Sequence, residues 1–150
     1  MQDFNNCLKE LIKILGKNNV LTSKTDLLLN SYDASPIKAQ PKAILNIYDT
    51  EQIPNILKVL NTFNIPCVVR MTGSNHDGAC LALTGGIVLN LAPLDKILEI
   101  NTKEHFAIVE SGVINQDLQN ALEPLGFFYA HFISDALVFQ IFSKWSIKII

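Results

Sequence analysis

The amino-acid sequence predicts an α+β fold, with an N-terminal βαβ-type unit of three parallel strands and helices, followed by a mixed or antiparallel strand subdomain. The first observation is the order of strand, helix and strand within residues 43–69, which is typical of a βαβ unit. The second is a further apolar strand pattern at residues 87–91, after a glycine-rich loop. The third is the loose alternation over residues 94–100 and 105–110, which favours antiparallel strands.

The composition is that of a folded domain with a sizeable core. The 150 residues include 49% hydrophobic and 17% charged side chains, a balance that excludes intrinsic disorder. A formal net charge of −2 argues against a surface that binds nucleic acid along its phosphate backbone. The sequence has no apolar run of the ~18 residues that a membrane span needs, and its start lacks the pattern of a secretion signal. We therefore expect a cytoplasmic protein with no transmembrane segment and no nucleic-acid partner.

Cysteine and histidine spacing gives no sign of a metal site or a disulfide. Cys7, Cys67 and Cys80 are far apart and lack Cys-x-x-Cys spacing. We expect them to be small buried side chains in a reducing compartment. His105 and His131 have no carboxylate or second histidine at ligand spacing, so no metal is expected.

Residues 1–35 are expected to form an N-terminal helical segment. Apolar side chains over residues 4–15 recur with the period of an amphipathic helix, and Gly16 suits its C-terminal cap. A capping-box pattern opens a second, short helix at residues 23–29. Residues 31–40 carry turn formers without a period, so we expect an extended connection there.

The βαβ unit starts with a strand at residues 43–47. Thr50 is the expected N-cap of the following helix, and the second strand covers residues 65–69. The apolar positions expected on the inward face of that helix are Ile53, Ile56, Leu57, Leu60 and Phe63. The two strands are expected to be parallel neighbours joined by a right-handed crossover.

A strand at residues 87–91 follows, then the two alternating segments, and then a helix at residues 115–125 that Gly126 closes. The remaining residues, 131–150, are apolar, contain neither proline nor glycine, and end on two isoleucines. Because domain ends are usually polar, we expect these residues to be a divergent apolar tail of a chain that was cut short.

The candidate site is the glycine loop, residues 71–86, which directly follows Arg70. In α/β sheets ligands gather outside the carboxyl ends of strands, where this loop is expected. Glycines allow successive N–H groups to approach an anion, and a fixed arginine adds charge or orders the loop. We interpret the loop as a phosphate- or pyrophosphate-binding loop. The alternative is an ordinary glycine-rich connection with an exposed arginine. It matches neither a P-loop nor Gly-x-Gly-x-x-Gly before a helix, which argues against a kinase or a nicotinamide dehydrogenase.

Several motifs occur in the order of a known family. They are Pro41–Ile44, Thr50–Ile53, Asn64–Arg70, the glycine loop, Leu83–Leu91, Leu94–Ile97 and Val109–Val113. Together they resemble the FAD-binding PCMH-type domain of the vanillyl-alcohol-oxidase superfamily, within it the branch of the glycolate oxidase FAD subunit and the D-lactate dehydrogenases. The resemblance covers roughly residues 8–129. It implies an incomplete PCMH-type fold, with the partial FAD-binding domain at residues 36–130.

The family's Arg-Gly-x-Gly-Thr/Ser-x-x-x-Gly loop falls on residues 70–78. The resemblance implies that FAD is the cofactor, bound non-covalently, with its pyrophosphate held mainly by backbone N–H groups. The cofactor-binding residues it implies are Arg70, Thr72, Gly73, Ser74, Asn75 and Gly78. Met71 replaces a family glycine, and a positive φ there would strain it and weaken FAD binding. His76 is expected to be a polar loop residue, with covalent flavin attachment as the alternative.

The resemblance implies the FAD-binding portion of a flavin-dependent 2-hydroxy-acid dehydrogenase or oxidase acting on glycolate or D-lactate. The family's second flavin motif and its substrate domain do not follow in this sequence. We therefore expect a truncated fragment that is inactive alone. The alternative is a non-catalytic subunit whose apolar tail docks a separately encoded partner chain that completes the FAD site. A phosphate-ligand module unrelated to flavin is a third hypothesis.

Overall fold

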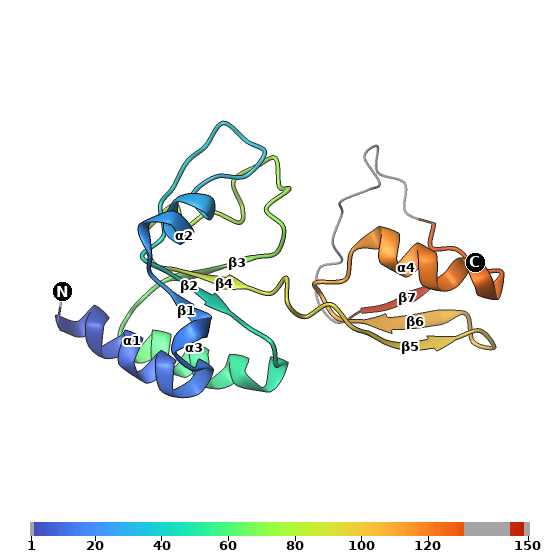
Figure 1. Cartoon of the computed structure of the whole chain (residues 1–150), viewed down its shortest axis with the longest axis horizontal. Helices are drawn as coiled ribbons and strands as arrows, with labels where there is room; N and C mark the ends of the chain where they lie inside the picture. The colour runs from blue at the N-terminus through green and yellow to red at the C-terminus, as the bar shows by residue number, and fades with distance from the viewer. Residues whose placement is uncertain (1, 131–144, 149–150) are drawn as a thin grey trace. The chain divides into compact units, whose positions relative to one another are not determined.

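The computed structural model describes residues 2–130 and 145–148 of the chain. It divides into two compact units, Met1–Pro93 and Leu94–Ile150 (Figure 1). The division at residues 35 and 130 that we expect from the sequence stays a prediction, and most of the apolar tail lies outside the described residues. Among the described residues, no helix combines the length and the hydropathy needed to cross a bilayer.

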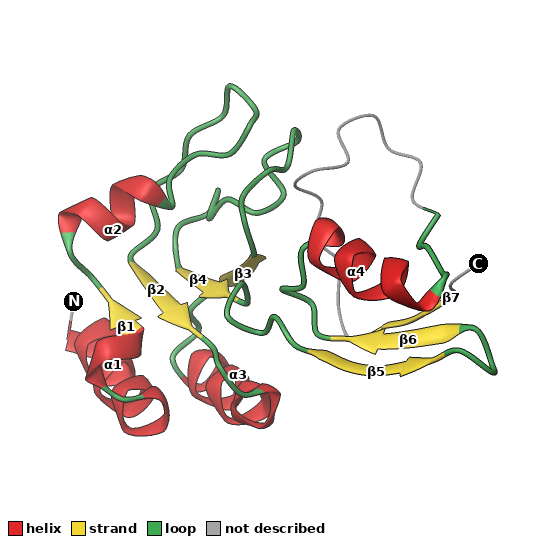
Figure 2. Ribbon diagram, turned by 45° about the vertical axis from the view of Figure 1, so that its right-hand side comes forward, coloured by secondary structure: helices red, strands yellow, loops and turns green. Residues whose placement is uncertain are grey.

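The first unit is a four-stranded sheet with helices on both sides of it (Figure 2). The helices are α1 (Gln2–Leu15), α2 (Lys24–Leu29) and α3 (Ile53–Thr62), with short 3-10 turns at Lys17–Asn19 and Thr50–Gln52. The strands are β1 (Val20–Leu21), β2 (Ala43–Asn46), β3 (Cys67–Arg70) and β4 (Ile87–Asn90). Strands β2, β3 and β4 are mutually parallel, and β1 pairs antiparallel with β2. Helices α1 and α3 pack against each other on one side of the sheet, and α2 lies on the other.

The strand order corrects one expectation from the sequence. Strands β2 and β3 are parallel but are not neighbours, because β4 lies between them in the order β1-β2-β4-β3. Burial explains this arrangement. Three successive β4 side chains, Ile87, Val88 and Leu89, are buried, whereas Cys67 and Val69 of β3 are exposed. A strand buried on both faces belongs in the centre of a parallel sheet, and a strand with exposed positions belongs at its edge.

The helix starts follow local capping chemistry, with one correction. Ser23 caps α2 as expected, since its hydroxyl accepts a hydrogen bond from the Asp26 amide at 3.2 Å. At the start of the next helical segment the cap is Asp49 rather than Thr50, because the Asp49 carboxylate accepts from the Glu51 amide at 2.9 Å. On the inward face of α3, Ile56 and Leu60 are buried as expected, but Leu57 is exposed.

The cysteines are all free, and two of them are buried as expected. Cys7 and Cys80 lie in the interior, whereas Cys67 is exposed on the edge strand β3, which corrects the expectation for that residue.

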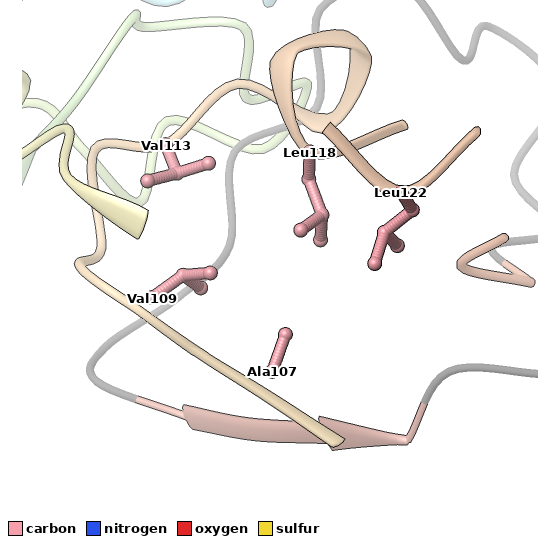
Figure 3. Packing of buried hydrophobic residues seen from close by; sticks show 5 residues of the cluster. All are labelled: Ala107, Val109, Val113, Leu118 and Leu122. Atoms are coloured by element: carbon pink, nitrogen blue, oxygen red, sulfur yellow. The ribbon is translucent and has the colours of Figure 1, made fainter. Parts of the chain in front are cut away.

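The second unit packs one helix on an antiparallel sheet of order β5-β6-β7. The elements are β5 (Ile97–Asn101), β6 (Phe106–Val109), α4 (Asn115–Leu122), a 3-10 turn at Glu123–Leu125 and β7 (Trp145–Lys148). Strands β5 and β6 pair antiparallel, and Gly126 ends the helical segment with φ 77, so both expectations are confirmed. Strand β7 was not expected, because no strand was predicted in the apolar tail. The core of this unit contains Ala107, Val109, Val113, Leu118 and Leu122 (Figure 3).

Replacing Leu118 by alanine is expected to lower the free energy of unfolding by about 2–5 kcal/mol. The Leu118 side chain is fully buried between α4 and the sheet, so its loss leaves a cavity in the smaller of the two cores. Urea denaturation followed by circular dichroism measures the change. Leu125→Ala is the matched control, because Leu125 is 49% exposed in the turn that follows the same helix. Equal losses from the two variants would contradict the assignment of Leu118 to the core.

Candidate functional site

Three polar residues lie at the carboxyl ends of the three parallel strands, at one edge of the sheet. Asn46 and Arg70 are both in register with Asn90, which ends the central strand β4. The Asn90 side-chain NH₂ group donates to the Asn46 side-chain oxygen, Oδ1, at 2.8 Å. The glycine loop leaves the sheet from this carboxyl edge directly after Arg70, as expected. The two asparagines were missed at the sequence level, although each is the polar residue that ends an apolar strand.

The Arg70 guanidinium lies beneath the glycine loop rather than in solvent. The residue is only 6% exposed, and its Nη1 lies 3.5 Å from the Cys80 sulfur, to which it donates. At Gly73 an added Cβ would lie 2.0 Å from Arg70 Nη2, so the loop backbone rests directly on the guanidinium. The exposed arginine of the alternative interpretation is therefore wrong. Of the two roles considered for this side chain, its position favours ordering of the loop.

The loop presents a run of open backbone donors, which we call the amide run, residues 73–76. Within the described part of the chain, the N–H groups of Gly73, Ser74, Asn75 and His76 have no hydrogen-bond acceptor. None of these residues is helical, and Gly73 has φ +75. The Thr72 and Ser74 hydroxyl oxygens lie 3.2 Å apart beside the run. Such a run of N–H groups and hydroxyls is the donor set that an anion requires.

Gly78 differs from the residues of the amide run. Its N–H donates to the Asp33 carboxylate at 3.0 Å, so this amide is engaged within the chain. Asp33 belongs to the connection between α2 and β2, which rises on the same side of the sheet as the loop in Figures 1 and 2. The sequence indicated only a local turn acceptor at Asp33, because a contact across 45 positions leaves no periodic signal in the sequence.

Charge and burial set the protonation of the Cys80 thiol. Burial raises the pKa of the Cys80 thiol, the Arg70 guanidinium lowers it, and the Asp33 carboxylate raises it again, with a net rise. Cys80 is therefore a neutral thiol at pH 7 and donates toward Asp33 Oδ2 at 3.7 Å. The thiol thus accepts from a buried cation and donates to a carboxylate.

Expectations about two further loop residues, Met71 and His76, can be compared with the structure. Met71 has no positive φ, because Asn64 and His105 are the non-glycine residues that adopt one in the described chain. The strain considered for Met71 is therefore absent. His76 is exposed, and its role stays a prediction.

In the second unit, the turn after β6 holds two polar groups near α4. The Glu110 carboxylate accepts from the Lys96 amide at 2.9 Å, which is a structural role. Asn115, the first residue of α4, is 4% exposed, and its side-chain oxygen has no hydrogen-bond partner. This buried oxygen was also missed at the sequence level.

The sequence profile of a family described as "FAD binding domain" matches residues 41–138. The chain belongs to this family. The match covers β2 to β6, the glycine loop and α4, and it extends into the apolar tail. FAD is therefore the cofactor of this FAD-binding domain, as the resemblance implied, and the α+β PCMH-type fold is confirmed.

Curated relatives include the glycolate oxidase subunit GlcD of Bacillus subtilis (strain 168), 34% identical over 122 residues. That alignment covers 81% of this chain and 26% of the relative. The D-lactate dehydrogenase of Anaerostipes hadrus is 29% identical over 93 residues, which are 61% of this chain and 19% of the relative. The FAD-binding domain thus spans about a quarter or less of the length of these relatives.

Solved structures show the same fold. Crystalline p-cresol methylhydroxylase with substrate bound superposes with a TM-score of 0.74 and 25% identity, covering 84% of this chain and 25% of that chain. Alkyldihydroxyacetonephosphate synthase reaches a TM-score of 0.81 at 16% identity over 91% of this chain and 30% of that chain, a likeness of fold alone.

Proposed function

We propose that this domain is the FAD-binding portion of a flavin-dependent 2-hydroxy-acid dehydrogenase or oxidase of the glycolate or D-lactate type. In this proposal the amide run binds the FAD pyrophosphate non-covalently, with help from the Thr72 and Ser74 hydroxyls. The bound flavin supplies the hydride acceptor for the α-carbon of the substrate. Because the domain spans about a quarter of its glycolate oxidase relative, we propose that it is inactive alone.

The observation that carries this proposal is the amide run at the carboxyl edge of the sheet. Four consecutive N–H groups are open to a ligand, and neighbouring hydroxyls add donors. The Asp77 and Asp33 carboxylates accept from other groups: Asp77 accepts from the Ala79 amide at 3.0 Å, and Asp33 accepts from the Gly78 amide at 3.0 Å. The donor set therefore fits a diphosphate. Arg70 contributes from beneath, by supporting Gly73 and by adding positive charge to the site.

Calorimetric titration of the 150-residue chain with FAD, ADP, FMN and riboflavin tests this role of the loop. We expect FAD to bind and ADP to compete with it, because both carry the diphosphate. FMN and riboflavin lack a diphosphate and should bind roughly tenfold or more weakly. Displacement of FAD by FMN but not by ADP would overturn the assignment of the loop to the diphosphate.

A second candidate function is a non-catalytic subunit that completes an FAD site with a separately encoded partner chain. Its support is the short coverage together with relatives that are themselves named as subunits, in Bacillus subtilis and in Pseudomonas putida. Mixing the chain with the B. subtilis GlcD polypeptide lacking its matched quarter tests both candidates. Dye-linked glycolate oxidation by the mixture, absent from either piece, favours the subunit. Oxidation by this chain alone would contradict both proposals of inactivity. A cytoplasmic location remains part of the proposal.

A further inference from the structure

The Asp33 carboxylate connects two segments that are distant in the sequence. Its Oδ1 accepts from the Ser35 amide at 2.8 Å and from the Ser35 hydroxyl at 2.5 Å. Its Oδ2 accepts from the Gly78 amide at 3.0 Å and from the Cys80 thiol at 3.7 Å. Each carboxylate oxygen therefore accepts from one backbone N–H, on opposite sides of the junction between the 31–40 connection and the glycine loop.

Neighbouring contacts hold the same two segments together. The Ala34 amide donates to the Asn75 carbonyl at 2.9 Å, a contact that fixes the backbone within the amide run. At Gly78, which has φ +76, an added Cβ would lie 3.0 Å from the Ile37 side chain, so the two backbones approach closely. Residues 33–37 thus contact the loop within the amide run and again just after it.

The carboxylate is also tied to the buried arginine. The Cys80 sulfur accepts from Arg70 Nη1 at 3.5 Å and donates to Asp33 Oδ2. One thiol therefore links the cation beneath Gly73 to the anion that holds Gly78. Gly73, which begins the amide run, and Gly78, which follows it, are therefore contacted by oppositely charged side chains.

We propose that Asp33 is a positioning residue for the dinucleotide loop. By accepting from the Gly78 amide it fixes the loop just after the amide run, so that the N–H groups of residues 73–76 stay open for the diphosphate. This inference rests on the proposed function of the amide run. Asparagine cannot replace Asp33 in this role, because one of its two side-chain ends is an NH₂ donor. In either orientation the NH₂ group would face a backbone N–H, of Ser35 or of Gly78.

The carboxylate must be ionised to accept from both amides. Burial raises the pKa of Asp33, but the hydrogen bonds from Ser35, Gly78 and Cys80 outweigh it, and the net pKa lies below the ordinary value. The charged or titratable groups facing it are Cys80, whose raised pKa keeps it a thiol, and beyond it the Arg70 guanidinium. The positioning effect is therefore complete at neutral pH and is lost as the pH falls through that lowered pKa.

The test compares the FAD dissociation constants of the wild-type chain, Asp33→Asn and Asp49→Asn. Asp49 is the matched control, because its carboxylate accepts from one amide, that of Glu51, and asparagine caps a helix equally well. We expect Asp33→Asn to weaken FAD binding roughly tenfold or more at pH 7, and Asp49→Asn to change it less than about twofold. Equal affinities for wild type and Asp33→Asn would overturn the inference, whereas no FAD binding by wild type would overturn the proposed function.

A pH profile separates positioning from general stability. We expect the FAD affinity of the wild-type chain to fall as the pH is lowered toward the Asp33 pKa. This fall in affinity should be missing in Asp33→Asn. Ser35→Ala is a milder second variant, because it removes the hydroxyl that donates to Asp33. Without this donor the Asp33 pKa rises, so FAD affinity should fall at a higher pH than in the wild-type chain. Circular dichroism at each pH confirms that the chain is folded. If FAD affinity falls at the same pH in Ser35→Ala as in the wild-type chain, with both folded, control of the loop by the carboxylate is contradicted.

Discussion

Replacing Gly86 by alanine is expected to lower the free energy of unfolding by about 3 kcal/mol or more. Gly86 has φ +99, and an added Cβ would lie 2.1 Å from the Pro66 carbonyl oxygen and 2.9 Å from its carbon. These are backbone atoms that hold β4 in place, since the same oxygen accepts from the Ile87 amide and the Gly86 carbonyl accepts from Lys42. A shift here disturbs both ladders of the central strand. Urea denaturation measures the loss.

Gly85→Ala is the control for this prediction. Gly85 also has a positive φ, +77, but the nearest atom to an added Cβ is Lys42 Cε at 3.9 Å. This variant should lose only the ~1 kcal/mol of a strained left-handed alanine. If the two variants lose equal stability, the close approach of β4 to Pro66 is not what requires glycine at position 86.

Replacing Gly73 by alanine is expected to weaken FAD binding roughly tenfold or more, with a loss of stability of about 1–3 kcal/mol. The new methyl group would lie 2.0 Å from Arg70 Nη2 and 2.3 Å from Cζ, so the buried guanidinium has to move. Because Gly73 begins the amide run, the open N–H groups move with it. Calorimetric titration with FAD measures the affinity, and urea denaturation of the same sample measures the stability.

Two comparisons test whether the contact with Arg70 causes the weaker FAD binding of Gly73→Ala. Gly16→Ala also places an alanine at a positive φ, +81, but with no atom within 4 Å of the new Cβ, and should leave FAD affinity unchanged. An Arg70→Ala background removes the obstructing guanidinium, so adding Gly73→Ala there should cost much less than in the wild-type chain. Additive effects of the two substitutions would show that Arg70 does not support the loop.

Local features of the fold could be predicted from the sequence because short-range chemistry determines them. The period of apolar side chains indicated α1, and Ser23 with Asp26 indicated the start of α2. The order of strands and helices indicated a parallel unit with a glycine loop at its carboxyl edge, and the motifs along it resembled the FAD-binding family. These signals lie within a few residues of each other or follow each other in order along the chain.

Tertiary structure alone decided three features that no local pattern contains. Strand β4, with three successive buried side chains, lies between β2 and β3, whereas β3, with exposed positions, lies at the edge, and this order is a property of the whole sheet. The buried Arg70 lies under the loop because a buried charge needs partners that folding supplies, and Asp33 contacts Gly78 across 45 positions of sequence. Sequence periodicity reports which face of an element is apolar, whereas the partner of a buried polar group depends on how the chain returns to it in space.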